Sequence, residues 1–407
     1  MTTIDSGRHL IDFDHHDAEF RDDNKAVVRR LHASGCPLGW SPAHGGYWAI
    51  YGYEAVYDAV HDTELFSSVH SSACPKGVPS AAYEIPLLPI DVDGPMVKEY
   101  RRVVLARLSP SGAAEDEPRL REICTELIDA FIERGSCDLS QDLLTALPAR
   151  WILEKLGWAP ERWPEWIEWI HATIHDRTDH PDRAEAAVGN IMGSIMTELA
   201  ARRAAPRDDL FSDIIASRPG GESMDDAGIV MMSFLLLLGG MDTTAGLTGN
   251  VIEILDTDHA LRQRLADDPA LIMSATEEFL RHESPSYGLY RTITRDAEFH
   301  GQQLRAGERV MLMFPAAGLD PATFEDVEAV DIDRAGNRHM GFGLGPHRCL
   351  GSHHARVMFR VMLEEVLRRL PDFRIVGSPQ RFHDAGDVYA IRHLQVAFTP
   401  GPRSNPA

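Results

Sequence analysis

Apolar residues recur at three- and four-residue spacing through most of the middle of the chain, a pattern that predicts helices. Period-two alternation, which predicts strands, is confined to segments nearer the two ends. In chain order the expected elements are a strand over 47–52, a helix over 54–61, helices within 96–203, a long helix over 224–257, two shorter helices ending near 282, strands within 290–312, a helix over 352–370 and terminal strands that include 390–398.

Turn-rich segments separate these elements. Segment 67–89 is rich in Ser, Pro and Gly and lacks periodicity, and long loops of this kind inside compact domains are often functional. Segments 206–221 and 315–345 are predicted to be irregular as well. No repeat or long linker divides the chain, so we expect one mainly helical domain with a small β part. It covers 1–407, with loose ends at about 1–15 and 401–407.

Composition and charge exclude several classes of protein. The 407 residues carry 40 Lys and Arg against 62 Asp and Glu, a net charge of −22 that lacks the basic surface needed for non-specific nucleic-acid binding. Five cysteines are too few for a disulfide scaffold and are typical of a reducing cytoplasm. The N-terminus does not resemble a signal peptide, and the apolar stretch 229–238 is far shorter than the ~20 residues that span a bilayer. We therefore expect a soluble, cytoplasmic protein without a membrane anchor.

The stretch from Phe342 to Gly351 is the most informative about chemistry. It places Cys349 just before a predicted helix, where free backbone N–H groups and the helix dipole favour a thiolate. Gly345 and Gly351 permit a tight loop and close approach of a flat ligand. Two other interpretations stay open: a buried structural cysteine, and a zinc site that lacks a second cysteine at ligand spacing. The zinc site would recruit His347, His353 and His354.

The spacing Phe-x-x-Gly-x-x-x-Cys-x-Gly, formed by Phe342, Gly345, Cys349 and Gly351, resembles the haem-binding loop of soluble bacterial cytochrome P-450 monooxygenases. The resemblance extends over roughly 40–400 and implies the cytochrome P-450 fold, a large helical domain with short β-sheets at the chain ends. It also implies haem b as the cofactor and Cys349 as the axial thiolate ligand of its iron, a ligand type that favours O–O cleavage.

A second motif of the same family is Glu278-Phe279-Leu280-Arg281, whose acid and base share one face of a helix. By resemblance, Glu278, Arg281 and Arg334 form a buried cluster that braces the cysteine loop, which is a structural role. The same spacing recurs at Glu99 with Arg102 and at Glu365 with Arg368. We interpret these copies as ordinary surface pairs, which contribute little to stability.

Segment 238–244, inside the long predicted helix, contains two adjacent glycines that each cost about 1 kcal/mol relative to alanine. The resemblance explains them as a groove where the helix opens over the haem, at Gly239. It also implies that Asp242 and Thr243 are an acid–alcohol pair that relays protons during oxygen activation. The alternative for the threonine is a hydrogen bond from its hydroxyl to a carbonyl one turn earlier.

Cations are expected around the haem edge, because haem carries two propionates. Motif position indicates Arg101, Arg291 and His347, and for each the alternative is a plain surface charge. Members of the family often have His or Gln where this chain has Val97, so one propionate contact is expected to be missing or to come from Lys98.

The resemblance implies insertion of one oxygen atom of O2 into a lipophilic small molecule, by hydroxylation or epoxidation. Oxidative coupling, peroxide-driven oxygenation and a non-catalytic haem sensor are the alternatives on the same fold. Terpenoid, steroid, fatty acid, aromatic and polyketide substrates all stay open. The expected pocket wall consists of the loop 72–88 together with Leu235, Leu238, Tyr287, Gly288, Leu289, Val388 and Tyr389.

Electrons are expected from outside the chain, because it contains no flavin or iron–sulfur motif. A ferredoxin with an NAD(P)H-dependent ferredoxin reductase is the expected donor, and the protein is expected to be a monomer. A local basic face around the cysteine loop would attract an acidic ferredoxin. Its candidate members are Arg101, Arg102, Arg107, Arg348, Arg356 and Arg360.

Overall fold

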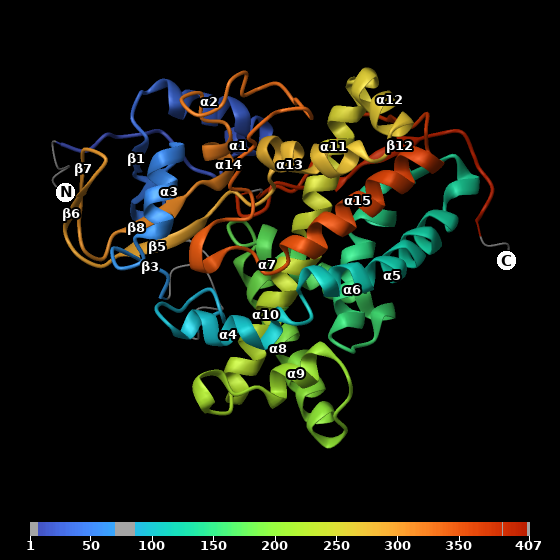
Figure 1. Ribbon diagram of the computed structural model, residues 1–407, viewed down its shortest axis with the longest axis horizontal. Helices are drawn as coiled ribbons and strands as arrows, with labels where there is room; N and C mark the ends of the chain where they lie inside the picture. The colour runs from blue at the N-terminus through green and yellow to red at the C-terminus, as the bar shows by residue number, and fades with distance from the viewer. Residues whose placement is uncertain (1–6, 70–85, 385, 405–407) are drawn as a thin grey trace.

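The computed structural model describes residues 7–69, 86–384 and 386–404. Most of it is helical, and a five-stranded sheet lies at one side (Figure 1). The sheet joins early strands to strands from the second half of the chain, in the order β1-β2-β8-β5-β3, with β2 and β8 parallel and the other pairs antiparallel. Its strands are β1 (Leu38–Ser41), β2 (Tyr47–Ile50), β3 (Phe66–Ser67), β5 (Leu289–Ile293) and β8 (Arg309–Leu312).

Three small sheets complete the β part. The last strand of the chain, β12 (Gln395–Ala397), lies between β4 (Ser136–Asp138) and β9 (Arg374–Ile375). β10 (Gln380–Arg381) pairs with β11 (Ile391–His393), and β6 (Ala297–Phe299) pairs with β7 (Gln302–Leu304). β4 was not expected from the sequence pattern, because its three residues gain their partners only from the distant C-terminal strand.

The helices form the bulk of the molecule and enclose its largest apolar core. The early ones are α1 (Ala18–Asp22), α2 (Asn24–Ala33), α3 (Tyr53–His61), α4 (Met96–Leu105), α5 (Pro110–Asp129), α6 (Ala146–Lys155), α7 (Trp163–His175) and α8 (Pro181–Ala204). The later ones are α9 (Leu210–Ala216), α10 (Asp226–Met241), α11 (Thr243–Thr257), α12 (His259–Asp267), α13 (Leu271–Glu283), α14 (Phe314–Gly318) and α15 (Ser352–Arg369).

The expected elements are largely present, with three corrections. The segment predicted as a broken connection, 206–221, contains α9, whose start is capped by the Asp209 carboxylate. The segment predicted as irregular, 315–345, begins inside α14. The long helix predicted over 224–257 is two helices, α10 and α11, that meet at Asp242.

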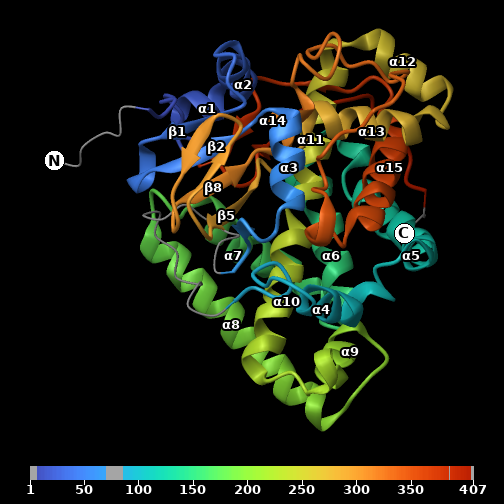
Figure 2. The same ribbon diagram turned by 60° about the vertical axis from the view of Figure 1, so that its left-hand side comes forward.

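α10 and α11 run through the centre of the helical part (Figure 2). Together, as Asp226–Thr257, they form the one segment of the described chain that is long and apolar enough to cross a membrane, and 56% of its most apolar window is buried inside the protein. α10 packs against α6 and α8, and α11 packs against α13 and α15. Packing on several sides accounts for a helix that is apolar all round.

Candidate active site

The loop that carries Cys349 is held from both sides. The Cys349 N–H donates to the Phe342 carbonyl at 2.8 Å. The Arg356 guanidinium lies 4.5 Å from the centre of the Phe342 ring, and two hydrogen bonds of 2.6 and 2.7 Å fix it to Glu277. α15 begins three residues after the cysteine. The loop therefore presents Cys349 from fixed backbone, and the cysteine side chain stays exposed.

The two glycines of this loop serve different purposes. Gly345 has φ +63°, in the left-handed region, and a Cβ there would lie 3.1 Å from Val60 Cγ1. Gly351 has an ordinary φ of −79°. A Cβ at Gly351 would lie 3.9 Å from the Cys349 sulfur. Glycine is therefore required at Gly345 by backbone conformation, whereas at Gly351 it keeps the space beside the sulfur clear.

The Gly351 N–H at the start of α15 and the charges of Arg101, Arg356 and Arg348 act on the Cys349 thiol and favour its thiolate form. A bound metal ion deprotonates a coordinating thiol outright. The start of α15 and a bound iron would therefore both favour the thiolate.

The zinc alternative finds no support in the structure. Among the described residues, Cys349 belongs to no group of three His, Cys, Asp or Glu side chains close enough to share a metal ion. His354 Nε2 instead lies 3.0 Å from the Asp116 carboxylate, and His347 Nε2 lies 3.1 Å from the Ser68 hydroxyl.

Three side chains predicted to meet haem propionates converge on one place from three elements. Arg101 comes from α4, Arg291 from β5 and His347 from the cysteine loop, and α4 packs against that loop. Burial, with the charges of Arg291 and Arg101, lowers the pKa of His347 to about 4. Arg291 and Arg101 therefore lie close enough to His347 for their charges to act on its imidazole.

Arg291 shows that this place suits an anion. Its side chain is only 5% exposed, and its one hydrogen bond in the described structure goes to the Tyr290 carbonyl at 2.6 Å. It makes no ion pair with any described carboxylate. Burial lowers its pKa to about 10, against the attraction of Asp93 and Asp91, so the buried guanidinium remains charged. A buried charge without a counter-ion is costly, and an anionic ligand would remove that cost.

The expected substitute for the family's usual propionate contact is absent. Val97 is buried in α4, and the neighbouring Lys98 is exposed on another side of the same helix. Lys98 therefore points to solvent.

Glu278, Arg281 and Arg334 form the buried cluster that the motif predicted. The Glu278 carboxylate accepts from Arg281 Nε and Nη2 at 2.8 and 2.7 Å, and from Arg334 Nε at 3.2 Å. The side chains of Arg281 and Glu278 are 0% and 1% exposed. Arg281 also donates to the carbonyls of Gly318, Val327 and Ala329. Glu278 thus anchors the irregular segment that leads to the cysteine loop, which agrees with a structural role.

The two adjacent glycines at the end of α10 face different surroundings. A Cβ on Gly240 would lie 3.3 Å from Ile152 Cγ1 on α6, so the glycine allows close helix packing. A Cβ on Gly239 would have no other atom within 4 Å, and this glycine is exposed although its helix is in the core. Leu235, Leu238 and Thr243 share this partly accessible face, which is the open side expected from the resemblance.

Asp242, at the junction of α10 and α11, points to two histidines of α7 rather than to solvent. His175 Nε2 lies 2.9 Å from Asp242 Oδ2, and His171 Nε2 lies 3.3 Å from Oδ1. Burial would raise the pKa of Asp242, but these two histidines hold it well below its ordinary value. His171 and His175 are four residues apart, and this spacing places them on one face of a helix. The sequence pattern did not indicate that this face contacts Asp242.

The Thr243 hydroxyl donates to the Gly239 carbonyl at 3.0 Å, the bond to the preceding turn that the sequence left as an alternative. While this bond lasts, the hydroxyl offers only its lone pairs to a bound molecule. Thr243 is partly accessible, whereas the next residue, Thr244, is buried.

The predicted pocket wall is only partly supported. Leu235 and Leu238 lie on the accessible face of α10. Tyr287 and Tyr389 are 3% and 5% exposed and pack into the cluster around Phe20, whose ring centre is 4.4 Å from that of Tyr287. These two tyrosines therefore belong to the apolar core rather than to the predicted pocket wall.

The other predicted wall residues are packed against neighbouring strands or the apolar core. A Cβ on Gly288 would lie 2.2 Å from the Leu312 carbonyl oxygen, so this glycine serves the β5–β8 pairing. Val388 is buried and bridges to Ser286, while Leu289 packs against the core of the sheet. Most of the loop 72–88 lies outside the described residues.

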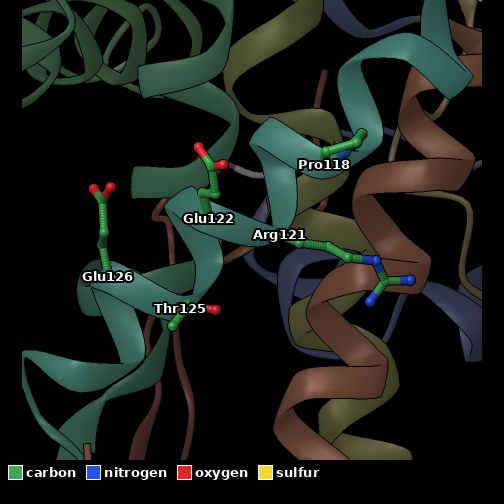
Figure 3. A pocket seen from close by; sticks show the side chains of 5 residues that line it. All are labelled: Pro118, Arg121, Glu122, Thr125 and Glu126. Carbon is green, nitrogen blue, oxygen red and sulfur yellow. The ribbon is translucent and has the colours of Figure 1, made fainter. Parts of the chain in front are cut away.

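A hollow on the side of α5, of about 450 Å³, does not suit a lipophilic substrate. Figure 3 shows its lining. Arg121 there is already paired with Glu117 and Glu364. The hollow is lined by Pro118, Arg121, Glu122, Thr125 and Glu126.

Fewer of the predicted arginines than expected can contribute an unpaired positive charge to the basic face around the cysteine loop. Four of the six arginines are ion-paired: Arg102 with Glu99, Arg107 with Asp208 and Asp213, Arg356 with Glu277, and Arg360 with Glu117 and Glu364. Arg101 and Arg348 make no ion pair with a carboxylate in the described part of the chain. Only these two keep an uncompensated positive charge.

Comparison with known proteins agrees with this geometry. The family model for Cytochrome P450 matches residues 270–375. A steroid C26-monooxygenase of Mycobacterium tuberculosis is 35% identical over 86% of this chain and 94% of its own length. The erythromycin C-12 hydroxylase of Saccharopolyspora erythraea is 30% identical over 88% of this chain and 91% of its own. A crystal structure from Bacillus megaterium, in complex with testosterone, is 26% identical with a TM-score of 0.84 and covers 94% of this chain and 99% of that chain.

The chain belongs to the cytochrome P450 family. It has the mainly helical fold of that family, and it is a haem-dependent monooxygenase and therefore an oxidoreductase. The cofactor of the family is haem b. The residues fit this group, since an exposed cysteine side chain, a buried arginine without a carboxylate partner and an uncovered helix face at Gly239 are what a thiolate-ligated dianionic macrocycle requires.

Proposed function

We propose that this protein inserts one oxygen atom of O2 into a lipophilic small molecule, using haem held by Cys349 and electrons from a ferredoxin and its reductase. The exposed Cys349 side chain in a fixed loop beside the unpaired Arg101 carries this proposal. Haem bound through a thiolate supplies the oxygen activation, and the protein supplies the ligand, orientation and protons. In this arrangement Arg101, Arg291 and His347 would bind the propionates, and the open face of α10 would lie against the distal side.

The hydrogen bonds of His175 indicate that a proton is stored beside Asp242. His175 Nδ1 lies 2.7 Å from the Asp384 carbonyl oxygen, an acceptor only, and Nε2 lies 2.9 Å from the Asp242 carboxylate. A neutral imidazole has one N–H, so both contacts are satisfied only if an extra proton resides on the Asp242–His175 pair. The His175 ring is held for this by Phe382, stacked at 3.7 Å and 5°.

Protons reach this buried pair through His171. The side chains of Asp242 and His175 are each 1% exposed, whereas His171 is 16% exposed and touches the other carboxylate oxygen. Proton transfer from solvent would run through His171 to Asp242, and from there towards the open face at Thr243. A peroxide-driven enzyme would need no such store, and this favours dioxygen as the oxidant over the peroxygenase alternative.

Thr243→Ala is expected to uncouple electron use from product formation. The partly accessible Thr243 hydroxyl would accept a hydrogen bond from an O–H donor on the open side of α10. Its removal would leave that donor without a partner and should not change haem binding. We expect reduced nicotinamide consumption to continue within a few-fold, hydrogen peroxide to rise, and product to fall by about tenfold or more. The measurement is a paired count of all three. Thr243→Ser, which keeps the hydroxyl, should remain coupled, and full coupling in Thr243→Ala would remove Thr243 from this role.

Asp242→Asn is expected to slow oxygen-dependent turnover itself by about 10²-fold, the usual contribution of a positioned acid–base group. The amide cannot carry the stored proton, so proton transfer becomes rate-limiting and the solvent deuterium isotope effect on turnover should increase. Glu253→Gln is the control, because Glu253 lies on α11, which begins directly after Asp242, and pairs with Arg381 instead. An unchanged rate and isotope effect in Asp242→Asn would contradict the proton store.

The substrate class best supported is a steroid or a similarly bulky lipophile. Relatives named as steroid C26-monooxygenases are 35–37% identical to this chain, and the Bacillus megaterium structure was solved with testosterone. The accessible face of α10 offers the apolar Leu235 and Leu238 to such a molecule. This proposal is tested by spectral titration of the ferric protein with four ligands: a steroid bearing a long side chain, testosterone, linalool and a macrolide. A spectral shift with linalool or the macrolide alone would contradict a steroid-like substrate.

The electron donor is proposed to dock beside the cysteine loop, where the exposed Arg348 is uncompensated. We also propose that the protein works as a cytoplasmic monomer. Turnover with a ferredoxin and its reductase that falls steeply as salt increases would support the electrostatic docking. Salt-independent turnover would contradict it.

A further inference from the structure

A group of histidines and aspartates outside the active site joins the N-terminal segment to the loop that precedes the last strands. His15, His16 and Asp387 each offer a ligand atom, and these atoms lie within 4.8 Å of one another. His15 is fully buried, and the His16 side chain is 2% exposed. Neither the monooxygenase reaction nor haem binding uses these residues.

The hydrogen bonds of His16 leave one ring nitrogen ready to bind an ion. Its Nδ1 lies 2.7 Å from Asp384 Oδ1. Its Nε2 is buried and has no hydrogen-bond partner among the residues that the structure describes. A histidine whose one nitrogen donates to a carboxylate keeps a lone pair on the other, and this carboxylate–histidine arrangement is typical of protein metal ligands. Asp384 is itself held by Thr178 Oγ1 at 3.0 Å and by the Gly386 N–H at 3.0 Å.

The surrounding charges favour a dication. Three carboxylates, those of Asp14, Asp384 and Asp387, face one guanidinium, that of Arg177, which pairs with Asp387. Apart from the histidines, these groups leave an excess of two negative charges in a largely buried place.

A further histidine stands beside this group. The ring centres of His44 and His16 are 5.3 Å apart, and His44 Nε2 lies 2.9 Å from Asp14 Oδ1. His44 has φ +50°, a left-handed conformation that is strained for a residue with a side chain and that is concentrated at functional sites.

We propose that His15, His16 and Asp387 bind a divalent ion of the zinc class. Two imidazoles and one carboxylate suit zinc better than magnesium or calcium, which prefer oxygen ligands. Ligand atoms around tetrahedral zinc are about 3.4 Å apart at bond lengths of about 2.1 Å, so the three atoms would draw together by roughly an ångström. His15 would exchange one of its two tyrosine hydrogen bonds for the ion, and the contact of Nδ1 with the Tyr47 hydroxyl, at 3.2 Å, is the longer. The fourth position would belong to water or to His44.

The ion would fasten the segment before α1 to the loop at Asp384. That loop also supplies the carbonyl that accepts from His175 Nδ1. Asp384 therefore connects the two places, because its side chain contacts His16 and its carbonyl contacts His175 of the Asp242–His175 pair. Its role is structural, and it does not depend on the substrate or the redox partner.

The test uses the haem-loaded protein, freed of loosely bound metal by a chelator and then titrated with Zn²⁺. Zinc and iron are counted together by mass spectrometry, and we expect one zinc per chain. His16→Gln and Asp387→Asn should each weaken binding by at least 100-fold, and Asp384→Asn by about 10–100-fold, the usual effect of removing a histidine's carboxylate partner. His393→Gln is the matched control, because His393 Nδ1 contacts Asp138 at the same 2.7 Å but belongs to no group of three ligands in the described chain.

Absence of stoichiometric zinc in the unmodified protein, or equal affinity in His16→Gln, would overturn the proposal. Anomalous diffraction at the zinc edge, on crystals of the unmodified protein soaked in zinc, gives a result independent of how the variants fold. An ion between His15, His16 and Asp387 would support the proposal, and an ion only elsewhere would refute it.

Discussion

Glu278→Ala is expected to give a chain that neither reaches a stable native state nor retains haem. The substitution leaves Arg281, which is 0% exposed, without its carboxylate partner, and it also releases Arg334. Removing one member of a buried ion pair costs about 3–5 kcal/mol, a large part of the roughly 5–15 kcal/mol that stabilises a folded protein. The measurements are the free energy of unfolding by denaturant and the haem content of the purified protein.

The two other copies of the motif provide matched controls. The side chains of Glu365 and Glu99 are 13% and 33% exposed, but their partners Arg368 and Arg102 are 60% and 67% exposed, so each arginine stays hydrated when its partner is removed. Such pairs contribute about 0–1 kcal/mol. Glu365→Ala and Glu99→Ala should therefore retain haem and unfold close to the unmodified protein. If Glu278→Ala is tolerated equally well, the cluster does not brace the cysteine loop.

Cys349→His is expected to abolish the red-shifted Soret band of the ferrous carbonyl complex completely, together with monooxygenase activity. This band reports a thiolate bound to the iron, and the Cys349 loop presents an exposed thiol beside Arg101. The loop should stay folded, because the Cys349 N–H to Phe342 bond is a backbone bond that the substitution keeps. The measurement is the difference spectrum with and without carbon monoxide.

The remaining cysteines are the controls for this experiment. Cys124 and Cys137 are buried, and burial raises the pKa of both thiols, so they are poor candidates for a thiolate. Cys36→Ser, Cys124→Ala and Cys137→Ala should leave the spectrum unchanged, and the same is expected for Cys74, which lies outside the described residues. A surviving red-shifted band in Cys349→His would mean that another residue is the ligand.

Local patterns in the sequence determined most of the fold class and the chemistry. Helical periodicity, which acts over three to four residues, located the long helices and the C-terminal α15. The spacing around Cys349 and the Glu278-x-x-Arg281 motif are also local, because a loop before a helix and one helix face are determined by residues close in sequence. The same spacing could not separate the fully buried Glu278–Arg281 pair from the two copies whose arginines, Arg102 and Arg368, are exposed, since burial is not a local property.

Only the tertiary structure decided which side chains meet across long distances in sequence. Asp242 and His175 are 67 residues apart, and their contact exists because α7 packs against α10. Arg291 lacks a carboxylate partner in the described chain while Arg356 and Arg360 have one, a difference that the arginine positions alone do not contain. Tyr287 belongs to the apolar core rather than to the pocket wall because the rings of Phe20, on α1, and Tyr389 pack against it. Pairing, burial and charge compensation follow from packing between distant elements, whereas spacing along the chain reports only the few residues on either side.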